Sequence, residues 1–405
     1  MGEDNVSEFD LINPTESHSM LREMVRNFVD EKVESQALQH DKEEKFNLDL
    51  FKELGDLGLL GLTVSEKFDG SELDPVSVVI VHEELSSSDP AFTLSYLAHS
   101  MLTANNLSVN GSEDQKQRYL PGLCSGDLIG CMAMSEPDYG TDVMGMKTTA
   151  KLNSDGNWVI NGNKMWITNG SIDEEGTPAD VVWLYAKTGE NEKGRAEIST
   201  FIIEKGMEGY NVGQKIYDKT GMRASNTAEL VFENCIVPPE NLVGSVGGSV
   251  LHMMRNLELE RIGLAAMSLG IARRSLHEMN RYATERTSFG KSIREYGQIQ
   301  RHIAESYAEY KAMQAYVYNT ARLINLESGG YRLDTDGVKL FATTSAKNIA
   351  DRAIQVMGGY GYVGEYVVER LWRDSKLLEI GGGTLESHQK NMTKELFKHP
   401  DYIFK

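Results

Sequence analysis

Cysteine, long apolar runs and an excess of positive charge are all missing or scarce in this sequence. Its three cysteines, Cys124, Cys131 and Cys235, lie far apart in a chain of 405 residues. This spacing suggests neither a disulfide framework nor a metal cluster, and it favours a reducing compartment. The nine histidines show no ligand spacing, so we expect no metal. No apolar run reaches the length of a membrane span, so we expect no membrane-spanning segment.

The balance of charge is acidic, with a formal net charge of -19. This argues against nucleic acid and anionic membranes as partners, although a few local arginines could still hold an anionic ligand. The first ten residues, MGEDNVSEFD, are acidic and have no apolar core, and Val6 breaks the myristoylation pattern. We therefore expect a cytoplasmic bacterial protein, or a mitochondrial matrix protein if a transit peptide has been removed.

The hydrophobic pattern changes twice along the chain. From residue 14 to about 128, apolar residues recur every three or four positions, which predicts helices. Segments such as WVINGNKMWITNG and TAELVFENCIVP then indicate strands, with Asn161-Gly162 and Asn169-Gly170 as turn signals. Helical patterns return from Gly244. We expect a helical domain at 1–128, a β domain at 129–243 and a second helical domain at 244–405, with helices at 248–283, 297–327, 334–358 and 385–397.

Three consecutive glycines, Gly381, Gly382 and Gly383, stand in the segment EIGGGTLE. Glycine costs backbone entropy and packs nothing, so the segment needs either room or an unusual backbone. One interpretation is a helix C-cap followed by a tight turn, and the other is space for a substrate. A further glycine pattern, G-x-G-x-x-G within GGYGYVG, follows a helical segment rather than a strand, so we do not assign a dinucleotide-binding fold to it.

Glu260 falls inside an apolar stripe of the expected helix 248–283. The stripe consists of Met253, Leu257, Leu264, Met267 and Ile271. A carboxylate in such a position is costly unless it is paired or functional. A structural pair with an arginine and a base whose pKa is raised by burial both remain open, since Arg261 lies near the same face.

Several polar segments could carry chemistry. They are CMAMSEPDYGTD after an apolar strand, KMWITNG with Trp166 and Thr168 on one strand face, RTSFGK, and ERLWRDSK. Tryptophan beside hydroxyl donors could wall a flat aromatic ring, although a lone tryptophan is more often core. The arginines could contact phosphates or form surface ion pairs.

Taken together, these segments resemble the acyl-CoA dehydrogenase family of flavoproteins, and most closely its isovaleryl-CoA dehydrogenase type. The resemblance covers nearly the whole chain and rests on five motifs in order: MSEPDYGTD, NGNKMWITNG, ERTSFGK, QVMGGYGYVGEYVVERLWRDSK and GGTLE. It implies a mainly α fold with an N-terminal helical domain, a middle β-barrel-like domain and a C-terminal four-helix bundle.

The resemblance also implies FAD as cofactor, held by residues of two subunits in a homotetramer. It places Met134, Ser135, Trp166 and Thr168 along the flavin ring, and Thr384 and Glu386 beside the cofactor near the glycines. At the pyrophosphate and adenosine side, across a subunit interface, it places Arg286, Ser288, Phe289, Gln355 and Gly359. Thr141 matches a contact to the CoA portion, with Arg261, Gly381 and Gly382 at the substrate.

Most relatives carry a catalytic glutamate just before the GT of the last motif, where this chain has Gly382. The isovaleryl type instead places the base on a bundle helix before an arginine, which corresponds to Glu260. The implied reaction is α,β-dehydrogenation of a short branched acyl-CoA, with an electron-transferring flavoprotein as acceptor. Glu258 is the alternative base. Two departures, Asp138-Tyr139 and Gly297, fall at the CoA entrance and at an adenosine contact.

Three other functions stay open at this point. They are an oxygen-using acyl-CoA oxidase-like flavoenzyme, a dehydrogenase for longer branched (terpenoid) acyl-CoA, and a CoA-binding or scaffold protein that has lost its base.

Overall fold

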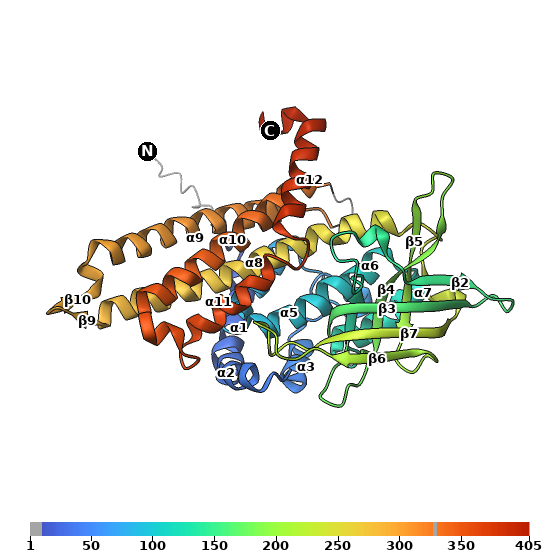
Figure 1. Ribbon diagram of the computed structural model, residues 1–405, viewed down its shortest axis with the longest axis horizontal. Helices are drawn as coiled ribbons and strands as arrows, with labels where there is room; N and C mark the ends of the chain where they lie inside the picture. Colours follow the sequence, from blue (N-terminus) through green and yellow to red (C-terminus); the bar gives the residue numbers. More distant parts are fainter. Residues whose placement is uncertain (1–9, 327–329, 405) are drawn as a thin grey trace, which may run out of the picture.

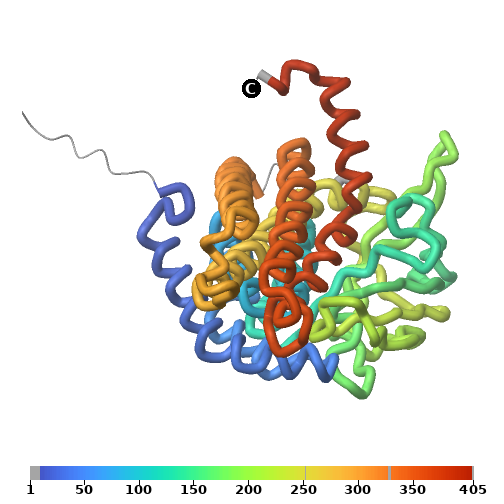
Figure 2. Tube along the Cα trace, turned by 60° about the vertical axis from the view of Figure 1, so that its left-hand side comes forward, coloured from blue at the N-terminus to red at the C-terminus, as the bar shows by residue number. Residues whose placement is uncertain are grey.

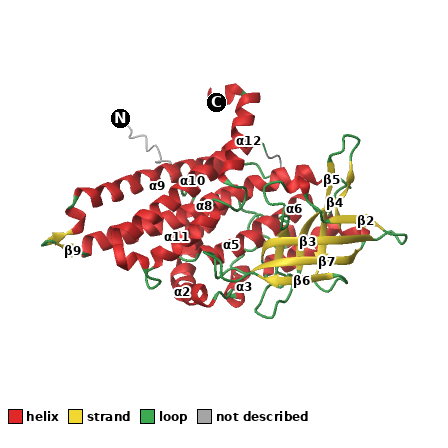
Figure 3. Cartoon of the chain, viewed as in Figure 1, coloured by secondary structure: helices red, strands yellow, loops and turns green. Residues whose placement is uncertain are grey.

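The computed structural model describes residues 10–326 and 330–404, and the predicted order of helices, strands and helices is confirmed (Figures 1 and 3). The N-terminal helices are α1 (Glu16–Phe28), α2 (Glu34–Glu43), α3 (Leu48–Asp56), α4 (Pro75–Ser86), α5 (Pro90–His99), α6 (Asn106–Asn110) and α7 (Glu113–Ser125). Asp74 and Asp89 cap α4 and α5 by accepting backbone N–H groups, each followed by proline at the first helical position. These two Asp-Pro pairs therefore fix where the central helices begin.

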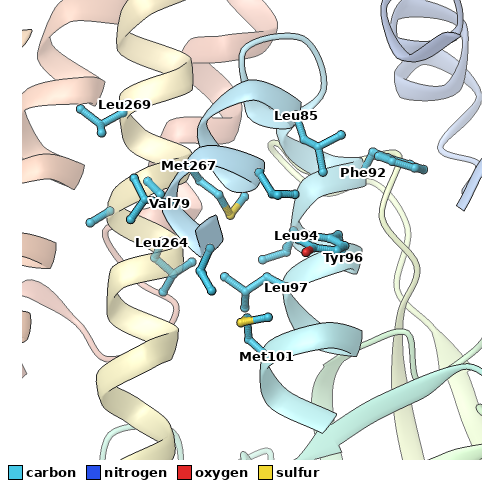
Figure 4. Close-up of a cluster of buried hydrophobic side chains, with 14 of the residues drawn as sticks. Val79, Leu85, Phe92, Leu94, Tyr96, Leu97, Met101, Leu264, Met267 and Leu269 are labelled. Atoms are coloured by element: carbon cyan, nitrogen blue, oxygen red, sulfur yellow. The ribbon is translucent and has the colours of Figure 1, made fainter. Parts of the chain in front are cut away.

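Helices α4 and α5 form the centre of the largest hydrophobic core. Both helices are buried on all sides, which explains why their sequences are apolar without a polar face. Figure 4 shows Val79, Leu97 and Met101 packed toward Leu264 and Met267 of α8 (Ser249–Glu285). The helix that carries Glu260 is thus fixed against the N-terminal helices.

The middle of the chain forms an eight-stranded sheet with β6 and β8 at its edges and β1 added parallel to β4. Its strands are β1 (Gly130–Ala133), β2 (Thr149–Leu152), β3 (Trp158–Thr168), β4 (Val181–Glu190), β5 (Ala196–Glu204), β6 (Tyr210–Lys215), β7 (Thr227–Val237) and β8 (Leu242–Val243). The prediction of a turn at Asn161-Gly162 is wrong. Both residues lie inside β3, where its register to β7 shifts. Gly162 takes a φ of 147°, and a Cβ atom at this position would lie 2.5 Å from the hydroxyl oxygen of Thr148.

The C-terminal part is a bundle of long helices. After α8 come the small hairpin β9 (Thr287–Ser288) and β10 (Lys291–Ser292), then α9 (Gly297–Leu323), α10 (Arg332–Met357), α11 (Val367–Leu378) and α12 (Leu385–Lys398). The four expected helices are present within a few residues, and the end expected at residue 327 lies outside the described residues. Our helix prediction missed α11. The bundle consists of α8 to α11, whereas α12 leaves the body of the molecule (Figure 2).

Within the described part of the chain, none of the helices combines the length and the hydropathy needed to cross a membrane.

Candidate active site

Glu260 lies on the buried face of α8, with 7% of its surface exposed. Burial raises the pKa of its carboxyl group, and the nearby charges of Arg261 and Lys339 oppose that shift. No described residue donates a hydrogen bond to the Glu260 carboxylate. A buried acid with a raised pKa and no donor is suited to take up a proton from a ligand.

Gly382 faces this carboxylate from a different part of the chain. A Cβ atom placed on Gly382 would lie 3.4 Å from Oε1 of Glu260 and 2.3 Å from Cδ1 of Leu264. The residue has a φ of 64°, in the left-handed region that glycine adopts without strain. No described group accepts a hydrogen bond from its N–H. The interpretation of the glycines as a turn after a helix is therefore confirmed, since the segment follows the end of α11. Space for a substrate beside Glu260 stays a prediction.

Gly381 is less constrained than its two neighbours. Its N–H donates to the carbonyl oxygen of Leu377 at 2.8 Å, which extends the last turn of α11. A Cβ atom on Gly381 would meet only Leu377, at 3.6 Å or more. The absence of a side chain at this position is therefore not required by the backbone.

Glu258, the alternative base, has backbone partners. Its carboxylate accepts the N–H groups of Gly330 and Tyr331 just before α10, at 3.2 Å each. Hydrogen bonds of this kind fix the side chain in place. Glu258 therefore tethers the start of α10 and does not point toward Gly382 as Glu260 does.

A buried network lies behind Glu260. The guanidinium group of Arg261 turns to Asp336 of α10, with Nε 3.2 Å from Oδ1. The same oxygen lies 2.5 Å from Nδ1 of His388 on α12, and Nε2 of His388 lies 3.0 Å from the carbonyl oxygen of Gly383. Lys339 donates to that carbonyl oxygen at 2.6 Å.

Our sequence reasoning missed Asp336, Lys339 and His388. A signal was present for two of them, since Asp336 and Lys339 follow the helical spacing of the buried face of α10. The same argument that singled out Glu260, a charge on a buried stripe, applies to both.

Of the four predicted ring contacts, Met134 and Ser135 directly follow β1, and Trp166 and Thr168 lie at the end of β3. Trp166 is 60% exposed and has a φ of 66°, at the point where the register between β3 and β7 shifts. A bulky residue in this conformation is strained, and such strain occurs mainly at functional sites. We had placed Trp166 and Thr168, the last residue of β3, on one face of the strand by regular alternation. The register shift at Trp166 interrupts that alternation.

A buried ion pair fixes Met134 and Ser135 beside this strand. Lys164 of β3 is fully buried, and its Nζ lies 3.0 Å from Glu136 and 2.9 Å from the carbonyl oxygen of Met134. The N–H of Met165 donates to the carbonyl oxygen of Ser135. Neither Lys164 nor Glu136 was predicted as part of the site.

The candidates for the pyrophosphate and adenosine side gather at the far end of the bundle, near the β9–β10 hairpin at the left in Figure 1. Arg286, Ser288, Phe289 and Gly359 line a hollow of about 710 Å³ together with Tyr360 and Tyr366. Phe289 is 96% exposed at the tip of the β9–β10 hairpin. Gln355 is exposed on the preceding turn of α10 and does not line the hollow.

Arg286 lies far from the candidate base within one chain. A helix rises about 1.5 Å per residue, so Glu260 and Arg286, both on or directly after α8, lie roughly 39 Å apart. That distance exceeds the length of an extended flavin dinucleotide.

The other predicted contacts lie near the glycines or at the surface. Thr384 caps α12, and its hydroxyl accepts the N–H of Ser387. Glu386 is exposed in the first turn of α12, and Thr141 is exposed in the loop after β1. Lys147 lies over the ring of Tyr139, one of the departures, at 5.5 Å. Gly297, the other departure, is exposed at the first residue of α9.

Comparison with known families gives one consistent result. Family models described as the N-terminal, middle and C-terminal domains of acyl-CoA dehydrogenase match residues 15–127, 131–235 and 250–397. A mitochondrial isovaleryl-CoA dehydrogenase from Oryza sativa subsp. japonica is 42% identical over 386 residues, which cover 95% of this chain and 92% of the relative.

Two solved structures show the same fold. Butyryl-CoA dehydrogenase from Megasphaera elsdenii superposes with a TM-score of 0.89 at 32% identity, covering 95% of this chain and 98% of that one. An acyl-CoA dehydrogenase complexed with FAD, from Bacillus anthracis, superposes with a TM-score of 0.87 at 30% identity, covering 95% and 67%.

Proposed function

Because the chain belongs to the acyl-CoA dehydrogenase family, we propose that it dehydrogenates the Cα–Cβ bond of a short branched acyl-CoA resembling isovaleryl-CoA, with Glu260 as the base. The observation that carries this proposal is the meeting of Gly382 with the Glu260 carboxylate. The chain lacks an acid at 382 and holds one opposite it, on α8.

The described residues fit FAD. Trp166 offers an exposed, flat aromatic face in the strand next to Met134 and Ser135, and Arg286 supplies a cation at the hollow beside the β9–β10 hairpin. Bound FAD would supply the acceptor for the hydride that leaves the β-carbon. Since Arg286 lies roughly 39 Å along α8 from Glu260, too far for one FAD molecule placed beside the base, we propose that Arg286, Ser288 and Phe289 act on the cofactor of a neighbouring chain in a homotetramer.

The residues of this chain would then bind, orient and deprotonate the substrate. Glu260 takes the α-proton, which the thioester carbonyl acidifies. The free N–H of Gly382 donates to the carbonyl oxygen as negative charge develops there. Gly381 leaves space for the methyl branch, and Thr141 contacts the CoA portion. An electron-transferring flavoprotein would take the electrons away.

The test is anaerobic flavin bleaching by a panel of straight and branched acyl-CoA substrates. We expect isovaleryl-CoA to bleach the flavin faster than butyryl-CoA, and Glu260→Gln to lower the rate by roughly 10²–10⁴ while FAD stays bound. Glu258→Gln is the matched control, and it should lower stability more than it lowers the rate.

Other outcomes would replace the proposal. Near-normal turnover in Glu260→Gln, with Glu258→Gln inactive, would move the base to Glu258. Turnover with oxygen alone would favour an acyl-CoA oxidase. A preference for a longer branched acyl chain would favour a terpenoid acyl-CoA as the substrate. A purified protein that stays colourless after FAD is added would favour a scaffold.

A further inference from the structure

Lys339 is an unusual residue for the interior of a helical bundle. Its side chain is fully buried on the face of α10 that packs against α8, and burial lowers its pKa to about 8. A lysine is almost never fully buried unless it has a partner that offsets the loss of water. Its hydrogen-bond partner here is a backbone oxygen, that of Gly383.

That oxygen lies in the turn that places Gly382 in front of Glu260. A carbonyl oxygen has two lone pairs, and Nζ of Lys339 and Nε2 of His388 both lie within hydrogen-bond distance of this one. Both ring nitrogens of His388 face acceptors, and a neutral ring can donate to only one of them. The ammonium group of Lys339 is therefore the constant donor.

Asp336 joins this anchor to the helix of the base. Its Oδ1 lies against Nε of Arg261 on α8 and Nδ1 of His388 on α12. Residues of α10 and α12 thus reach the glycine turn, and Asp336 links them to Arg261 on α8. The turn itself contains residues with φ angles of 64° and 96°. Glycines contribute no side-chain contacts to the turn, so we expect the contacts of Lys339 and His388 with the Gly383 carbonyl oxygen to fix its position.

Lys339 also carries charge toward Glu260. The charged or titratable groups facing Glu260 are Arg261 on its own helix, Lys339 on α10 and Tyr185 on β4. Lys339 in turn faces Glu260, Arg261, Asp336 and Glu379. Arg261 forms an ion pair with Asp336, whereas Lys339 has no carboxylate within ion-pair distance among the described residues.

We propose that Lys339 is a positioning residue for the base: its ammonium group, supported by the Asp336–His388 pair, anchors the Gly383 carbonyl so that Gly382 stays in front of Glu260, and its charge keeps the Glu260 carboxylate ionised. The charge half rests on the proposed function of Glu260, whereas the anchoring half does not.

Three variants separate the two halves. Lys339→Met removes both the charge and the donor. Lys339→Gln removes the charge but keeps an N–H donor that can reach toward the carbonyl. Lys347→Met, two turns further along α10 and outside the network, is the matched control. Each is purified with FAD bound.

The charge is measured without turnover. A 3-thia-acyl-CoA has an acidic α-proton but no β-hydrogen to transfer, and its bound enolate gives a long-wavelength absorbance with the flavin. We expect the pH midpoint of this absorbance to rise by about one unit in Lys339→Met and Lys339→Gln, because an opposite charge near a carboxylate lowers its pKa by that order. Lys347→Met should keep the original midpoint. An unchanged midpoint in both Lys339 variants overturns the charge role.

The anchor is measured by hydrogen–deuterium exchange of the peptide 379–387. We expect exchange at least about tenfold faster in Lys339→Met, since the turn loses its constant donor, and a smaller change in Lys339→Gln. Repeating the measurement in a Glu260→Gln background should give the same acceleration. Exchange equal to that of the Lys347→Met control overturns the anchoring role.

The two proposals fail in different ways. If Glu260→Gln still forms the enolate of the 3-thia analogue, the base assignment is wrong and the exchange result stands by itself. If Glu260→Gln abolishes the enolate and the Lys339 variants leave both midpoint and exchange unchanged, only this inference is wrong. Should Lys339→Met not fold, Lys339→Gln and Asp336→Asn carry the test, and Asp336→Asn must accelerate exchange of 379–387.

Discussion

We expect that a glutamate in the glycine turn can replace Glu260 of α8 as the base, provided that Leu264 is replaced by a smaller residue. The change is Glu260→Gly combined with Gly382→Glu. A Cβ atom on Gly382 points at the present carboxylate, 3.4 Å from Oε1, so a glutamate there approaches the same substrate proton from the opposite side. The same atom would lie 2.3 Å from Cδ1 of Leu264, a distance that real side chains do not tolerate.

The expected magnitudes follow from this geometry. Loss of a positioned base costs roughly 10²–10⁴ in rate. A non-glycine residue in the left-handed region costs about 1–2 kcal/mol of stability. A buried Leu→Ala change costs about 2–5 kcal/mol, part of which the incoming glutamate side chain offsets by filling the space. A base misplaced by about 1 Å can lose 10²-fold.

We therefore expect a graded result. Glu260→Gly alone should lose roughly 10²–10⁴ in the rate of flavin reduction. Adding Gly382→Glu should recover little because Leu264 blocks the side chain. Adding Leu264→Ala as well should recover about ten- to a hundredfold, and incompletely, since alignment is imperfect.

The assay is single-turnover flavin bleaching with isovaleryl-CoA on protein shown by absorbance to be loaded with FAD. The matched controls are Glu260→Gly with Leu264→Ala, and the triple variant with glutamine in place of glutamate at 382. Recovery that is equal with glutamine would show that a carboxylate is not responsible. A folded, flavin-loaded triple variant with no recovery would refute a shared proton position for 260 and 382.

Three further predictions concern specificity, pH and the ring contacts. Gly381→Tyr should lower the ratio of kcat/KM for isovaleryl-CoA over butyryl-CoA by about one to two orders of magnitude. The backbone at 381 tolerates a side chain, and a pocket discriminates a methyl group by roughly 10–200-fold. An unchanged ratio would mean that the methyl branch does not lie beside Gly381. Burial raises the pKa of Asp374 from 3.8 to about 7, so between these values the folded state holds a proton that the unfolded chain has released. Stability should therefore fall as the pH rises from 3.8 to about 7 and level off above it. Asp374→Asn should flatten that fall in Tm, and parallel curves would contradict it. Glu136→Gln should lower the stability by about 3–5 kcal/mol, because it leaves the fully buried Lys164 without its charged partner. It should also weaken FAD binding in a titration, whereas the exposed Glu233→Gln on β7 should change neither.

Local patterns in the sequence were enough for the order of the domains and for Glu260. The helical period of three to four and the strand period of two are properties of neighbouring residues, so they are readable without the fold. Glu260 was identifiable because a carboxylate interrupted an apolar stripe. The caps Asp74 and Asp89, each before a proline, are local signals of the same kind.

Helix α11 was missed for a physical reason. Its buried face contains Arg370 and Asp374 beside Val368 and Leu371. Charges on the inner face break the hydrophobic pattern, and they are tolerated only because other parts of the chain meet them there. Asp374 accepts the N–H of Met222 from the loop after β6, a contact across more than a hundred residues of sequence.

The conformation of β3 and the surroundings of the base were decided only by the tertiary structure. Whether Asn161-Gly162 makes a turn or a bulge depends on β7 pairing alongside it, and the exposure of Trp166 follows from the second register shift in the same strand. Sequence motifs suggested that Gly382 and Glu260 belong together, but the packing of α11 against α8 sets the 3.4 Å approach. Lys339 was an ordinary lysine in the sequence. In the folded protein its ammonium group is buried away from water, and the backbone carbonyl oxygen of Gly383 replaces water as its hydrogen-bond partner.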